Sequence, residues 1–124
     1  MWCMMTPDPA KAAEFQNRHA PLTDALYREI SASIPPDWSL AVLEVDVVES
    51  PPGRGTAFSF RLYNPSSRKL LKDIPPSVAQ AAASVHAICC EYLHLWVRGT
   101  FTVVRSQPSQ IAMALANYDY APVR

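Results

Sequence analysis

The spacing of the apolar residues changes repeatedly along this chain, and two of the changes fall at proline pairs. Up to Pro35 and Pro36, apolar residues recur every three or four positions, as they do on one face of a helix. After Trp38 they alternate with polar residues, which is typical of a strand with one buried face. Helical spacing returns at Pro75 and Pro76, and alternation resumes later. These changes predict the order helix, two strands, helix, two strands.

The first helical region, residues 9–34, is expected to consist of two parts. Pro21 should break or kink the helix, because proline has no backbone N–H and its ring clashes with the preceding turn. Residues 1–21 would then form an N-terminal helical extension. Thr23 or Asp24 would cap the second part. The apolar stripe of that second part consists of Leu22, Leu26, Ile30 and Ile34.

Two alternating segments, residues 40–50 and 56–64, follow the first helix. Residues 50–55 lie between them and contain two of the three glycines of the chain, so they predict the turn of a β-hairpin. The connection after the hairpin leaves open a short additional edge strand at residues 69–71.

The second helix is expected from Pro76 to about Val97, because its apolar residues keep a spacing of three to four. Gly99 would end this helix, since glycine adopts the positive φ that helix ends often require. Residues 99–105 and 110–120 then alternate as two further strands. In the last strand Ile111, Met113 and Leu115 are predicted to face the core, and Ala112, Ala114 and Ala116 to face the other way.

Two strand pairs separated by a helix favour a single α+β domain over residues 1–124. The expected architecture is a four-stranded antiparallel sheet with helices on one face, in the order α-β-β-α-β-β. Trp38 and Trp96 stand where helix and strand meet, so we expect both to be buried. The face of the sheet without helices would carry the polar residues of each strand and offer a surface for a partner.

The charge balance excludes a general electrostatic attraction to nucleic acid. Eleven Lys and Arg balance eleven Asp and Glu.

The chain has three cysteines, an odd number that favours reduced thiols over a disulfide framework. Reduced thiols, the absence of an apolar segment of about 20 residues and the lack of a signal-peptide pattern favour a cytoplasmic protein without membrane contact. The oligomeric state cannot be predicted from these features.

Cysteine and histidine recur along the second helical segment, where His86, Cys90 and His94 are spaced by four residues. One straight helix cannot easily place three consecutive turns around a tetrahedral metal ion, so no metal site is predicted. Cys90 with a neighbouring histidine would be a crude catalytic pair, and no phosphate-binding or oxyanion loop accompanies it. We therefore expect no catalytic residue and no cofactor, although a small metal or cysteine enzyme stays an alternative.

The chain resembles the YezG-like immunity proteins over residues 22–120. In that family a first helix leads through an I-P-x-x-W turn into a strand, and an acidic and aromatic motif closes the last strand. The matching residues are Ile34, Pro35, Trp38, Asp73, Ile74, Pro75, Trp96, Phe101, Tyr118, Asp119 and Tyr120.

The resemblance implies an immunity protein, a non-enzymatic antitoxin that binds and blocks the toxic domain of a bacterial effector, in some cases a nuclease. A secretion chaperone that holds an extended effector segment is the alternative. Carboxylates backed by aromatic side chains suit the occlusion of a catalytic cleft. The expected partner-binding residues are Glu44, Asp46, Arg61, Tyr118, Asp119 and Tyr120.

Overall fold

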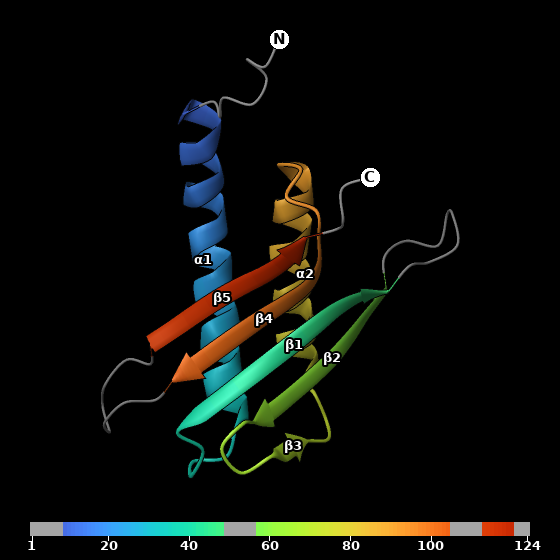
Figure 1. The fold of residues 1–124 in the computed structure, drawn as a ribbon. Coiled ribbons are helices and arrows are strands. Elements are labelled where there is room, and N and C mark those ends of the chain that lie inside the picture. Colours follow the sequence, from blue (N-terminus) through green and yellow to red (C-terminus); the bar gives the residue numbers. More distant parts are fainter. Residues whose placement is uncertain (1–8, 49–56, 105–112, 121–124) are drawn as a thin grey trace.

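Two helices cover one face of a five-stranded antiparallel sheet in the computed structural model of the protein (Figure 1). The structure describes residues 9–48, 57–104 and 113–120. The predicted α+β class is confirmed, and the sheet has one strand more than the four predicted. The elements are α1 (Pro9–Ser33), β1 (Leu40–Val48), β2 (Ala57–Asn64), β3 (Lys69–Leu71), α2 (Pro76–Glu91), β4 (Trp96–Val104) and β5 (Met113–Tyr120).

The strands lie in the order β3-β2-β1-β4-β5, so β1 and β4 form the centre of the sheet. β1 pairs with β2 in antiparallel register, as predicted, and β4 pairs with β5 in the same way. The turn residues predicted at 50–55 lie outside the described residues. The short strand that the sequence left open is formed as β3, which pairs with β2 at one edge of the sheet.

The prediction that Pro21 breaks the first helix is wrong, because α1 runs without interruption through it. The boundary at residue 21 therefore falls inside one helix. Side chains on both sides of the proline share one packed stripe, since Phe15 and Leu26 both contact the core. This packing offsets the roughly 3 kcal/mol that an internal proline costs. Neither Thr23 nor Asp24 is a cap, because both lie within the helix. The Thr23 hydroxyl donates to the carbonyl of Ala20 at 2.9 Å.

The second helix ends at Glu91, and two residues later Leu93 takes the position after a helix end that glycine usually occupies. Leu93 has a φ of 63°. The Leu93 amide donates to the carbonyl of Cys90 at 3.0 Å, and the His94 amide donates to the carbonyl of Cys89 at 2.8 Å. These two hydrogen bonds form a Schellman motif, which satisfies carbonyls that the helix leaves unpaired.

The predictions of a helix end at Val97 and of a stop at Gly99 are wrong, because Trp96 already begins β4. Gly99 lies inside that strand, opposite Tyr118. A Cβ atom at this glycine would lie 3.0 Å from the Phe101 ring and 3.1 Å from the Trp96 ring. A side chain at this position would therefore press on the two aromatic rings.

In β5, the side chains that the structure describes face the opposite way from the prediction. Leu115 is 57% exposed, whereas Ala116 packs against the core. The cause is the cross-strand partner: Ala116 lies opposite the fully buried Phe101, where a small residue leaves room for the ring. The predictions for Ile111 and Ala112 lie outside the described residues.

The core lies between the helices and the sheet. Trp38 and Trp96 are 4% and 2% exposed, which confirms the prediction that both are buried. No helix among the described residues is long and apolar enough to cross a membrane. The other buried residues of the core are Leu26, Ile30, Ile34, Ala41, Leu43, Val45, Leu62, Val78, Ala82, Val85, Cys89, Phe101 and Val103.

Candidate partner-binding site

Neither helix covers the second face of the sheet, which we call the open face (Figure 1). Side chains alternate between the two faces of a strand, so the register of the buried residues assigns the intervening ones to this face. Its central residues are Val42, Glu44, Asp46, Ser59, Arg61, Tyr63, Leu70, Arg98, Thr100, Thr102, Leu115, Asn117 and Asp119.

The open face contains most of the predicted partner-binding residues. Glu44 of β1 lies opposite Arg61 of β2, and Asp46 of β1 lies opposite Arg98 of β4. Arg98 in turn lies opposite Asp119 of β5. The acids of β1 and the acid of β5 therefore belong to one surface, with β4 between them.

Glu44 is paired on both of its oxygens. Arg61 Nη2 donates to Glu44 Oε1 at 2.8 Å, and the Tyr63 hydroxyl donates to Glu44 Oε2 at 3.0 Å. The Arg61 guanidinium also lies 5.0 Å from the centre of the Tyr63 ring. Partial burial and the nearby carboxylate raise the pKa of Tyr63, so its hydroxyl stays protonated and remains a donor. A partner would meet Glu44 as part of a neutralised cluster.

Asp46 is paired with a residue that the sequence analysis missed. Arg98 Nε donates to Asp46 Oδ1 at 2.6 Å, and this bond raises the pKa of Arg98. No sequence signal points to the pair, because the two residues meet only through the register of β1 and β4. Asp119 forms no ion pair among the described residues, so it is the acid of this face that a cationic partner group can reach.

An apolar row crosses the open face beside these charges. Leu70, Tyr63 and Val42 lie opposite one another on β3, β2 and β1. The row continues through Thr102 to Leu115 on β4 and β5. Leu70 at one end is 52% exposed, while Val42 in the middle is 7% exposed. Apolar and aromatic side chains next to arginine are typical of protein–protein interfaces.

Tyr118, a predicted contact residue, instead belongs to the helix-covered face. Its ring stacks on Trp96 with centroids 5.1 Å apart, and its hydroxyl lies 2.9 Å from His19 Nε2. Burial raises the pKa of Tyr118 far above its ordinary value and lowers the pKa of His19. Both groups are therefore neutral at neutral pH. Tyr120 is 54% exposed and lies at the end of the same strand, beside His94.

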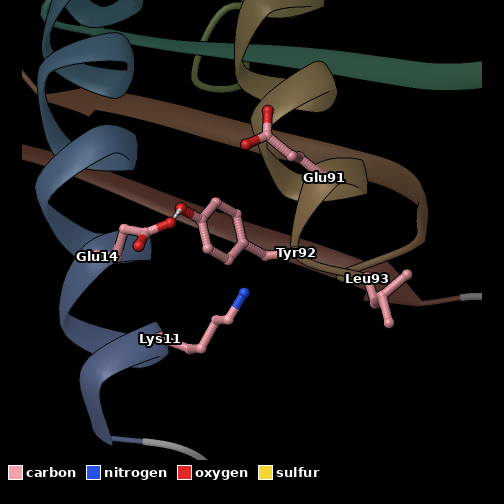
Figure 2. Close-up of a pocket in the computed structure, with 5 residues that line it drawn as sticks. All are labelled: Lys11, Glu14, Glu91, Tyr92 and Leu93. Atoms are coloured by element: carbon pink, nitrogen blue, oxygen red, sulfur yellow. Dashed lines mark hydrogen bonds between the residues drawn. The ribbon is translucent and has the colours of Figure 1, made fainter.

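A surface hollow of about 370 Å³ lies in the helical layer, away from the open face (Figure 2). It is lined by Lys11 and Glu14 of α1 and by Glu91, Tyr92 and Leu93 at the end of α2. The Tyr92 hydroxyl donates to Glu14, which joins the two helices across the hollow. None of the predicted partner-binding residues lines it.

His86, Cys90 and His94, which are spaced by four residues in the sequence, do not lie on one stripe of a helix. His86 Nε2 lies 3.5 Å from the sulfur of Cys90 within α2, but His94 lies beyond the helix end, against Phe15. Burial lowers the pKa of His86 and raises the pKa of Cys90, which favours a neutral imidazole and a protonated thiol. No group of three His, Cys, Asp or Glu in the described ranges is arranged to hold a metal ion.

Comparison with known proteins adds no relative to this description. No family model matches the chain, and no curated protein matches it.

Proposed function

We propose that this protein is an immunity protein of the YezG-like kind, which binds a folded toxic domain and covers its active site. The structural observation that supports the proposal is the open face: a sheet surface without a helix, with an apolar row next to arginines, a tyrosine and carboxylates. The residues that match the pattern of the YezG-like proteins suggest that the partner is the toxic domain of a bacterial effector.

The size of the open face is compatible with a specific complex. Strands about 4.8 Å apart and about 25 Å long give this face an area of roughly 500 Å². A stable interface buries about 800 Å² on each partner. The open face thus supplies more than half of such an interface, and neighbouring surface would supply the rest.

The charges of the open face bear on the chemistry of the toxin. Its central acids are Glu44, Asp46 and Asp119, and its central bases are Arg61 and Arg98. Because two acids are already paired with the two bases, a partner meets a nearly balanced surface with one available carboxylate. This pattern favours a toxin surface with an isolated Lys or Arg rather than a strongly basic cleft.

Growth rescue tests the proposal. The candidate toxin is the product of the neighbouring open reading frame, expressed from an inducible promoter with or without this protein. We expect growth only when the two are expressed together, and a one-to-one complex of the purified proteins. Failure to rescue growth, with no complex at micromolar concentrations, would reject the immunity function.

A secretion chaperone is the second candidate, and it is favoured by the outer edge of β5, with which no strand in the described part of the chain pairs. A chaperone binds an unfolded segment, whereas an immunity protein binds a folded domain. Binding assays with the folded toxin and with its urea-unfolded form, diluted immediately before measurement, separate the two functions.

A further inference from the structure

The two edges of the sheet are protected to different degrees. One edge is closed by β3, which has only three residues, begins with Lys69 and has Arg68 and Lys72 on its two sides. The other edge is β5, which has eight residues, MALANYDY, without lysine or proline. Natural proteins usually protect exposed edges with short strands, lysine or proline, because an unpaired backbone invites another strand. No described residue pairs with the outer side of β5.

The helical layer extends beyond this edge. Figure 1 shows the first turns of α1 continuing past β5, on the side away from β4. His19 of α1 contacts Tyr118 of β5 near this edge. Residues 9–18 precede this contact and rise about 15 Å along the helix axis. Because neighbouring strands are only about 4.8 Å apart, the overhang is long enough to cover an additional strand.

Aromatic side chains lie at the boundary between the overhang and β5. Phe15 stacks on His19 and lies 4.7 Å from the ring centre of His94. His94 in turn lies 6.5 Å from Tyr120. Phe15 is only partly buried, and His94 and Tyr120 are exposed. A strand added to β5 would place alternate side chains against this aromatic surface and shield it from water.

Asp119 supplies a charge on the other side of the same edge. Its cross-strand neighbour on β4 is Arg98, whose guanidinium is bonded to Asp46. A residue of an added strand opposite Asp119 would therefore meet an available carboxylate, which favours Lys or Arg at that position.

We propose that the outer edge of β5 receives an extended segment of a partner protein as a sixth strand. The segment has apolar side chains toward Phe15 and His94 and a basic side chain opposite Asp119. Backbone hydrogen bonds give such a complex affinity, and the alternating side chains give specificity. This inference goes beyond the proposed function, because it identifies a mode of binding that does not require the partner to be a toxin.

A second copy of the chain fits this edge less well. Antiparallel pairing of β5 with its own copy relates the two molecules by an axis perpendicular to the sheet, so both helical layers lie on one side. The overhanging turns of α1 would then occupy the layer that the helices of the second copy require. A single extended segment has no such helix.

Nuclear magnetic resonance with a designed peptide tests the proposal. The probe is a short capped peptide that alternates Thr and Val and has Arg at one central Thr position. A second probe has Glu in place of that Arg. Titration into the ¹⁵N-labelled full chain is expected to shift the amide signals of residues 113–120 most strongly. Asp119→Lys is expected to weaken the Arg peptide about fivefold and to strengthen the Glu peptide.

The control is Asp73→Lys, the same charge change next to the opposite edge. It is expected to leave both affinities unchanged. The proposal is overturned if millimolar peptide does not shift residues 113–120, if both charge variants change affinity alike, or if the free protein is already a dimer through β5. These outcomes do not depend on growth rescue, so the two proposals fail separately.

Discussion

The two faces of the sheet are held together by different contacts. On the helix-covered face, Trp96, Phe101 and Tyr118 pack as a cluster of rings above Gly99. On the open face, the same strands are joined by exposed ion pairs such as the one between Asp46 and Arg98. Buried rings contribute several kcal/mol each, whereas exposed ion pairs contribute about 1 kcal/mol or less. The difference indicates that the stability of the fold depends mainly on the helix-covered face.

Truncation of a buried ring should produce the largest loss of stability. Trp96→Ala is expected to lower the free energy of unfolding by about 3–5 kcal/mol, because it leaves a cavity in the core. Urea denaturation measures the change. The control is Leu115→Ala on the open face, which is expected to change stability by about 0.5 kcal/mol or less. Equal losses for the two variants would contradict the contrast between the faces.

Addition of a single methyl group should also distinguish the faces. Gly99→Ala is expected to cost about 1–3 kcal/mol, because the new Cβ would press on the buried rings of Trp96 and Phe101. Thr100→Ala changes the next residue, which points to the open face. It should cost less than about 1 kcal/mol, as surface substitutions usually do. If Gly99→Ala unfolds at the same urea concentration as the parent, the described ring packing is wrong.

Relief of backbone strain should stabilise the protein. Leu93 is 80% exposed and has a positive φ, which costs a non-glycine residue about 1–2 kcal/mol. Leu93→Gly is therefore expected to raise the free energy of unfolding by about 1 kcal/mol. Leu95→Gly serves as the control, because Leu95 is exposed but has no positive φ, and should lower stability. Thermal unfolding that shifts in the same direction for both would contradict this account of the α2 end.

The ion pairs of the open face should give the smallest effect. A double-mutant cycle of Asp46→Asn and Arg98→Gln is expected to yield only the small coupling free energy that is typical of exposed ion pairs. Because the pair is exposed, 1 M salt should reduce this coupling, since the screening length falls to about 3 Å. A coupling as large as that of a buried contact, and unchanged by salt, would contradict the contrast between the faces.

Much of this fold was predictable, because apolar spacing reports how an element is buried. The switch of spacing at Trp38 correctly separated α1 from β1. The same rule failed at Trp96, where helical spacing continued by coincidence beyond the end of α2. The true end depends on the positive φ of Leu93, which the sequence does not reveal because glycine usually occupies that position.

The candidate site was less predictable, because it depends on strand register. Alanine and leucine alternate in β5, and apolarity alone placed Leu115 inward. In the structure the ring of Phe101 requires the small Ala116 on the covered face, which turns Leu115 outward. The pairing of Asp46 with Arg98 likewise joins residues from distant parts of the chain. Such contacts follow from packing and not from local pattern.

One measurement tests most directly whether the open face binds the partner. Thr100 lies at its centre, between Glu44 and Asn117, so Thr100→Arg would place a long side chain in the path of a docking surface while remaining able to pair with Glu44. The control is Ala87→Arg on the exposed side of α2. Calorimetric titration with the purified candidate toxin domain is expected to show at least about tenfold weaker binding for Thr100→Arg and unchanged binding for Ala87→Arg, a difference of about 1.4 kcal/mol. Unchanged binding by Thr100→Arg together with loss of binding by Ala87→Arg would place the interface on the helical layer and contradict the account.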